Sequence, residues 1–238
     1  MNLGELLLEL LYPPKCALCG RLLEGEGPLC PDCGRTADWF APGISEGAWG
    51  RCAGVLRYDG AVRQAVHDFK FHGQDWRAVP FGALMAQTVR DRLGKDFDAV
   101  TWAPVSRKRL RKRGYDQSRL LAEELGRRLG RRPEALLRKA VDTPAQSTLE
   151  SAAARRENAQ NVYVLAPNAQ TAGRWILLVD DILTTGSTLA ACAQVLLAGG
   201  AASVDCAVLA VAGAENGPET GSETRAGAGA AEKNANKL

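Results

Sequence analysis

Short unbroken apolar runs alternate along this chain with segments in which apolar residues recur at helical spacing. Trp175-Ile-Leu-Leu-Val179 is such a run and is typical of a parallel strand that is covered on both faces. Residues 98–104 and 204–211 predict two further strands. Because strands alternate with helical segments, the pattern favours an α/β fold built on a parallel sheet.

Helical periodicity is clearest in residues 117–129, where leucines form one stripe and Gly130 follows as a stop signal. Residues 62–69 predict a second helix that ends near Gly73, and residues 188–198 predict a third. At the start of the chain, one helical face carries four leucines and ends at a Pro-Pro pair, which predicts a short helix packed on a neighbour: Leu3, Leu7, Leu10 and Leu11.

A chain of 238 residues can bury one good core and carry a small appendage. We expect an N-terminal helix and zinc-finger module in residues 1–50 and the main domain in residues 51–212. Residues 213–238 lack aromatic side chains and are rich in small and polar ones, so we expect a disordered tail. The net charge of +3 is too small to predict a partner.

Cysteine usage and the N-terminus predict a cytoplasmic protein. Seven cysteines would be odd for a secreted disulfide framework, which favours a reducing compartment. The leucine-rich start contains Glu5 and Glu9 and has no basic residue before Lys15. It is therefore expected to be neither a signal peptide nor a membrane span.

Two C-x-x-C pairs separated by ten residues have the spacing of a closed tetrahedral zinc site, which would stabilise a segment too small for its own core. A redox dithiol or two disulfides are the alternatives. Cys192 and Cys206 lie in apolar segments and are expected in the core, whereas the role of Cys52 stays open. The expected zinc ligands are Cys16, Cys19, Cys30 and Cys33.

Asp180 and Asp181 follow the run 175–179 directly and are expected at the carboxyl end of that strand. The residues after them can form a turn whose backbone N–H groups bind a phosphate at the start of the next helix. A capped helix with ordinary turn residues is the alternative, but it would need one side-chain oxygen only. The expected phosphate-binding residues are Thr184, Thr185, Gly186, Ser187 and Thr188.

A basic loop is expected directly after the strand that ends at Pro104, on the side of the sheet where ligands bind. Its cations could neutralise a pyrophosphate, track a nucleic-acid backbone or form a solvated surface. Single-stranded DNA is a serious candidate, with Tyr115 and Trp102 as possible stacking faces. The cations are Arg107, Lys108, Arg109, Arg111, Lys112 and Arg113, and the patch could extend to Arg127, Arg128, Arg131 and Arg132.

The two histidines, His67 and His72, lie close together beside phenylalanines and a lysine. A general base or a metal ligand is possible there. Ordinary surface histidines are the preferred interpretation, because four cysteines already satisfy a zinc ion.

The segment from Asp180 to Thr188 closely resembles the 5-phosphoribosyl-1-pyrophosphate (PRPP) motif of type I phosphoribosyltransferases. Together with the four-cysteine module and Arg113-Gly-Tyr-Asp-Gln-Ser118, it is similar to the ComF family over roughly residues 5–212. Asp116 stands where that family has asparagine. Further matches carry a one-residue insertion at Glu150 and comprise Gln146, Leu149, Arg155 and Asn158.

The resemblance implies an α/β fold: a parallel-sheet, type I phosphoribosyltransferase-like core with a small N-terminal four-cysteine zinc module. It also implies that Asp180 and Asp181 are the catalytic acids and contact ribose hydroxyls, while the turn wraps the 5-phosphate. Residues 139–165 would form a flexible hairpin that closes over bound PRPP, with Arg155 or Arg156 near the pyrophosphate. Zinc would be structural, and Mg²⁺ would be required if the protein is catalytic.

Two functions follow as expectations. The ComF resemblance implies a protein that handles single-stranded DNA in DNA uptake and natural transformation, beside a DNA-uptake helicase or other competence proteins. The alternative is an active phosphoribosyltransferase that acts on a base or an amine. Fold alone does not decide between them.

Overall fold

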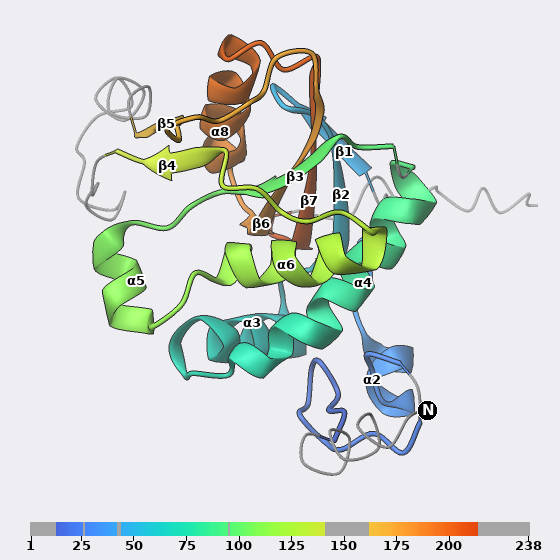
Figure 1. Ribbon diagram of the computed structural model, residues 1–238. Helices are drawn as coiled ribbons and strands as arrows, with labels where there is room; N and C mark the ends of the chain where they lie inside the picture. Colours follow the sequence, from blue (N-terminus) through green and yellow to red (C-terminus); the bar gives the residue numbers. More distant parts are fainter. Residues whose placement is uncertain (1–12, 26, 42–43, 95, 141–161, 214–238) are drawn as a thin grey trace, which may run out of the picture.

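The computed structural model describes residues 13–25, 27–41, 44–94, 96–140 and 162–213 (Figure 1). The expected N-terminal helix, Arg155 with its neighbouring family positions, and the expected tail beyond residue 213 lie outside these ranges. Among the described residues, no helix is long and apolar enough to cross a membrane.

A five-stranded sheet forms the centre of the molecule, in the order β1-β2-β7-β6-β3. β2, β7, β6 and β3 are parallel to one another, and β1 is an edge strand that pairs antiparallel with β2. The predicted parallel α/β architecture is therefore confirmed. The strands are β1 (Ile44–Gly47), β2 (Gly50–Arg57), β3 (Ala99–Trp102), β6 (Trp175–Leu183) and β7 (Ser203–Val211).

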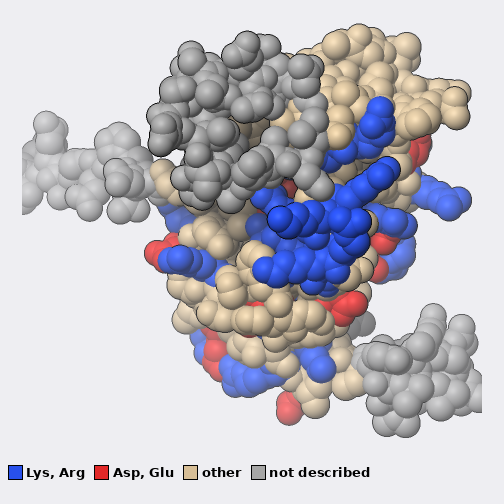
Figure 2. All heavy atoms as spheres, turned by 90° about the vertical axis from the view of Figure 1, so that its left-hand side faces the viewer, with Lys and Arg blue, Asp and Glu red and all other residues tan. Residues whose placement is uncertain are grey.

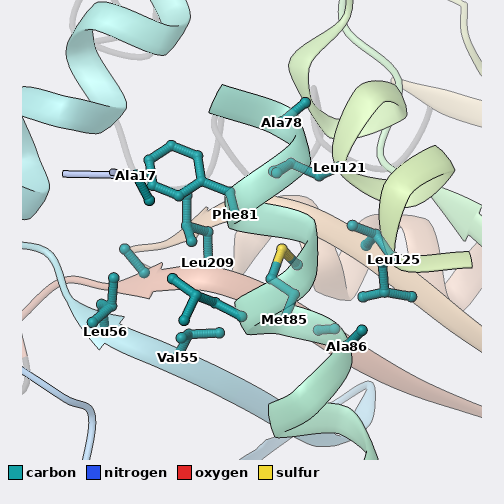
Figure 3. Close-up of a cluster of buried hydrophobic side chains, with 14 of the residues drawn as sticks. Ala17, Val55, Leu56, Ala78, Phe81, Met85, Ala86, Leu121, Leu125 and Leu209 are labelled. Atoms are coloured by element: carbon teal, nitrogen blue, oxygen red, sulfur yellow. The ribbon is translucent and has the colours of Figure 1, made fainter. Parts of the chain in front are cut away.

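Helices cover both faces of this sheet (Figure 1). One face packs against a cluster that includes Phe81, Met85, Leu121 and Leu125, whose side chains interdigitate with those of β2 and β7 (Figure 3). The helices of this face are α3 (Gly60–Phe71), α4 (Ala78–Arg92) and α6 (Gln117–Leu129). The other face packs against α8 (Ser187–Ala198) through a second cluster that contains Leu189, Cys192 and Leu196.

Smaller elements complete the described chain. The cysteine module carries the short helix α2 (Pro31–Thr36), and a 3₁₀ turn (Asp75–Arg77) precedes α4. β4 (Leu137–Lys139) pairs with β5 (Tyr163–Leu165) as a separate antiparallel ribbon, at the two ends of the expected hairpin.

Two local expectations are wrong. The basic segment is a helix, α5 (Arg107–Arg113), and not a loop. Ser106 accepts a hydrogen bond from the backbone N of Arg109 at its start, and Gly114 ends it at φ 86°. The acids do not follow their strand either: β6 continues to Leu183, so both aspartates lie within this strand.

Candidate functional site

Asp180 occupies a buried position in the parallel sheet, with 8% of its surface exposed. Its Oδ1 accepts hydrogen bonds from Ser118 Oγ at 2.8 Å and from the backbone N of Asp181 at 2.9 Å. Burial, together with the charge of Asp181, raises the pKa of Asp180 to about 7. Ser118, at the start of α6, therefore orients the first acid.

Asp181 forms an ion pair that the sequence analysis missed. Nζ of Lys70, in the last turn of α3, lies 2.8 Å from Asp181 Oδ1. Both side chains are largely buried, with 16% of Lys70 and 7% of Asp181 exposed. Oδ2 of Asp181 is buried and has no hydrogen-bond partner among the described residues. The second acid thus keeps one acceptor uncommitted.

The turn from Thr184 to Thr188 joins β6 to α8. Gly186 adopts the left-handed conformation, with φ 74°, at the N-cap of α8. Oγ1 of Thr185 and Oγ of Ser187 lie 2.8 Å apart, and both residues are exposed. Thr188 is half-buried and hydrogen-bonds the phenol of Tyr163 in β5. The turn therefore presents hydroxyl groups at the N-terminus of a 12-residue helix.

The helix α5 carries exposed cations beside this site. Figure 2, which views the side of the molecule where α5 lies, shows Lys and Arg side chains gathered there. Arg113 is half-buried and lies over the ring of Phe71, with 4.6 Å from Cζ to the ring centroid. Burial lowers the pKa of Arg113, and the negative charge of Asp181 opposes that shift. α5 thus brings positive charge to the acid pair.

Asp116 has a structural role in the connection between β3 and α6. One carboxylate oxygen accepts a hydrogen bond from the backbone N of Arg119 at 3.2 Å and caps α6. The other accepts from the backbone N of Val105 at 3.1 Å. Burial raises the pKa of this carboxyl group. Asp116 therefore ties the segment after β3 to the start of α6.

The two expected stacking residues are already engaged within the protein. Tyr115 packs near Phe69, and its hydroxyl donates to the Phe69 carbonyl oxygen. The guanidinium of Arg119 lies 5.8 Å from the ring centroid of Trp102. Phe71 is instead the exposed aromatic side chain beside α5, with 50% of its surface accessible.

The arginines at the far end of α6 do not continue the α5 patch. α6 starts near α5 and runs away from it (Figure 1). Its 13 residues span roughly 20 Å at the usual rise of an α-helix. This distance separates α5 from Arg127, Arg128, Arg131 and Arg132.

The four predicted zinc ligands come together in the N-terminal module. Their sulfur atoms all lie within 4.8 Å of one another. Although burial opposes it, hydrogen bonds from Arg21 and neighbouring thiols lower the pKa of Cys19 to about 6. The guanidinium of Arg21 lies 3.5 Å from Cys19 Sγ and 3.4 Å from Cys30 Sγ and is paired with Asp32. These thiol groups suit one structural zinc ion.

One buried arginine links the cysteine module to α3. Arg77 is 4% exposed and donates to the carbonyl oxygens of Ala17 and Leu18, between the first two cysteines. On its other side it lies 3.8 Å from Asp68 of α3. Ala17 itself belongs to the cluster in Figure 3.

The remaining cysteines and histidines are not part of these sites. Cys192 and Cys206 are fully buried, as expected, and Cys52 is buried beside Cys206 on the neighbouring strand. His67 and His72 lie on the surface at the end of α3, and Nδ1 of His72 is 2.8 Å from Asp68. The carboxylate of Asp68 is therefore already paired with His72 and Arg77.

Two domain families match the chain. The phosphoribosyl transferase domain matches residues 116–228, which include the acid pair and the turn after it. The double zinc ribbon domain matches residues 7–53, which include the four-cysteine cluster.

Curated relatives cover most of the chain. DNA utilization protein YhgH of Salmonella typhimurium is 32% identical over 200 residues, which are 79% of this chain and 86% of the relative. Competence protein ComFC of Bacillus subtilis is 27% identical, over 82% of this chain and 84% of the relative.

Among solved structures, adenine phosphoribosyltransferase from Thermoanaerobacter pseudethanolicus is similar with 20% identity and a TM-score of 0.37, over 58% of this chain and 82% of that one. The identity to YhgH and the matched phosphoribosyl transferase domain identify the family. The chain belongs to the ComF family of the phosphoribosyltransferase superfamily.

Proposed function

We propose that this ComF protein handles single-stranded DNA during DNA uptake and binds a ribose 5-phosphate or PRPP-type ligand at the acid pair. The observation that carries the proposal is the position of α5. This helix brings Arg113 near Asp181 and leaves five other cations exposed on the same short segment. The names of the relatives, a DNA utilization protein and competence proteins, support a role with DNA.

The sugar-phosphate part of the proposal rests on the β6–α8 connection. Backbone N–H groups at the start of α8 and the hydroxyls of Thr185 and Ser187 are suited to a phosphate monoester, and the helix dipole favours its charge. The uncommitted Oδ2 of Asp181 is suited to accept a hydrogen bond from a ribose hydroxyl. Both groups belong to one strand–turn–helix unit.

The DNA part rests on charge and an exposed ring. The side chains of Arg107, Arg109 and Arg111 are exposed, so their charges are available to nucleic-acid phosphates. Phe71, half exposed beneath Arg113, offers a face on which a base can stack. A strand bound along α5 would therefore pass the entrance of the sugar-phosphate site.

We also propose that the four-cysteine cluster binds one zinc ion and that this zinc is structural. Four thiolates close the tetrahedral shell and leave no position for substrate. The module is small, so metal coordination would supply the folding free energy that a larger core would otherwise supply.

The second candidate function is phosphoribosyl transfer from PRPP to a base or amine. The intact acid pair and phosphate turn favour it. The ribose and its 5-phosphate would be fixed by Asp180, Asp181 and the turn, and Arg113 would offset the charge that develops on departing pyrophosphate. The acid pair itself does not fit a resident Mg²⁺, because Asp181 is already paired with Lys70.

One experiment separates the two candidates. Purified protein is assayed for pyrophosphate release from PRPP with a panel of bases and amines, and its affinity for single-stranded DNA is measured in the same buffer. DNA binding without pyrophosphate release supports the DNA-handling function. Pyrophosphate release with an acceptor, and no DNA binding at moderate salt, would replace it by the transferase.

A further inference from the structure

Lys70 occupies the place beside the acid pair at which a free cation would otherwise gather. Its ammonium group lies 2.8 Å from Asp181 Oδ1, and the pair is largely buried. Arg113 adds a second cation whose charge interacts with Asp181. The protein thus supplies its own positive charge at the ribose end of the site.

The position of Lys70 is set by the packing of α3. The two residues on the buried face of its last turns, Val66 and Phe69, are fully buried in the core. They fix the helix against the sheet, so the side chain of Lys70 is directed at β6. A cation held in this way differs from a surface lysine, whose charge is spread over many conformations.

We propose that Lys70 is the built-in counter-cation of the acid pair and that the site binds the ribose 5-phosphate group without a divalent metal. The inference rests on the proposed sugar-phosphate site. Lys70 occupies Oδ1 of Asp181 and leaves Oδ2 for a ribose hydroxyl. Asp180 is held by Ser118, so each acid has one partner from outside β6.

A divalent ion would meet two obstacles at this position. It would have to displace the ammonium group of Lys70 from a buried carboxylate, or lie next to it and repel it. Mg²⁺ also requires near-ideal octahedral geometry and keeps several waters, which a largely buried acid pair does not accommodate. The ammonium group of a lysine needs neither octahedral coordination nor bound waters.

The test uses ribose 5-phosphate as the probe, because the pyrophosphate of PRPP would bind Mg²⁺ by itself. Affinity is measured by titration calorimetry in EDTA and again in Mg²⁺, on the full chain and three variants. Lys70→Gln removes the charge, Lys70→Arg keeps it, and Arg63→Gln removes a charge from the exposed face of the same helix. Thermal unfolding of each variant checks that it folds.

Wild type and Arg63→Gln are expected to bind equally well in EDTA and in Mg²⁺. Lys70→Gln is expected to bind at least about tenfold more weakly in EDTA and equally weakly in Mg²⁺, because the largely buried acid pair does not accommodate a hydrated metal ion in place of the missing ammonium group. Lys70→Arg should keep metal-independent binding, and it provides the test if Lys70→Gln does not fold.

Two results would overturn the inference while the proposed sugar-phosphate site stands. One is wild-type binding that requires Mg²⁺, and the other is undiminished binding by Lys70→Gln in EDTA. If wild type binds ribose 5-phosphate in neither buffer, the sugar-phosphate function itself is wrong, and the role of Lys70 is withdrawn with it.

Discussion

Gly186, in the turn from Thr184 to Thr188, lies directly against the indole ring of Trp49, so that a Cβ at Gly186 would overlap the ring. Trp49 is buried and precedes β2, whereas Gly186 follows β6. Two segments far apart in the sequence therefore fix the conformation of the turn. Glycine is required there for space as well as for its positive φ of 74°.

Gly186→Ala should therefore destabilise the protein by about 3 kcal/mol, from left-handed strain and the overlap with Trp49 together. Gly114→Ala is the matched control, because Gly114 has a φ of 86° and open space around it. We expect it to cost only about 1 kcal/mol. Chemical denaturation measures both, and equal losses would show that the Trp49 contact is unimportant.

Ribose 5-phosphate should raise the melting temperature, because a ligand that binds the native state stabilises it. At a concentration of 100 times Kd, the gain is about 2.7 kcal/mol. Asp181→Ala should abolish the shift. Asp205→Ala, at the opposite end of the sheet, removes a paired carboxylate and should leave the shift intact. A shift that survives in Asp181→Ala would contradict the assignment.

Single-stranded DNA binding should weaken steeply with salt, with a log–log slope of about −0.7 for each neutralised phosphate. Replacing Arg109, Arg111 and Arg113 together by Gln should flatten the slope by up to about two units and weaken binding to all sequences. Fluorescence anisotropy in a salt titration measures both quantities.

The control for this triple variant removes the same charge elsewhere. Arg127, Arg131 and Arg132 are exposed and lie at or beyond the far end of α6. Their replacement by Gln should leave the slope unchanged. Equal slopes in wild type and both triple variants would mean that α5 is a solvated surface and would return the argument to small-molecule chemistry.

Elemental analysis of protein purified without chelator should find about one zinc per chain. Cys16→Ala should lose the metal, because three thiolates leave the tetrahedral shell open. Cys52→Ala is the control: its thiol is buried in the sheet away from the cluster, so the variant should keep the metal. Full zinc content in Cys16→Ala would show that this residue is not a ligand.

Asp180 should make stability depend on pH. Burial raises its pKa from 3.8 to about 7, so the folded protein binds a proton that the unfolded chain has lost. The contribution of Asp180 to stability is therefore greatest below pH 4 and falls as pH rises through 7. The substitution Asp180→Asn removes this pH-dependent contribution and keeps a side chain of similar shape.

Melting curves across the pH range test this prediction. Relative to wild type, the melting temperature of Asp180→Asn should rise by about 5 °C between pH 5 and pH 8. Wild type and Asp180→Asn contain the same cysteines, so the effect of cysteine titration cancels when their melting temperatures are compared. Parallel curves would mean that Asp180 titrates at its ordinary pKa.

The sequence predicted the elements whose pattern is local. The helix at 117–129 and the strands around 98–104, 175–179 and 204–211 have continuous apolar patterns, and all are present. α5 was misjudged because like charges repel one another at helical spacing. Ser106 and Gly114, which cap it, were the signals that could have identified it.

The candidate site was only partly predictable for a different reason. The acid pair and the turn after it are adjacent in the sequence, so their spacing can be recognised from the sequence alone. Lys70 lies 111 residues before Asp181 and has no motif of its own. A single lysine on a helix predicts solvent exposure, and only the tertiary packing of α3 brings it to β6. The position of Phe71 beside α5 likewise follows only from the tertiary packing.

The buried guanidinium of Arg77 couples the cysteine module to α3. If the turn at Ala17 and Leu18 opened, a buried cation would lose two of its acceptors, which costs several kcal/mol. Loss of the module would therefore disturb the packing of Arg77 against α3. If the four-cysteine cluster binds zinc as proposed, metal occupancy and the stability of α3 are thermodynamically linked, so zinc at one end of the molecule would help to maintain the helix that holds Lys70 against Asp181.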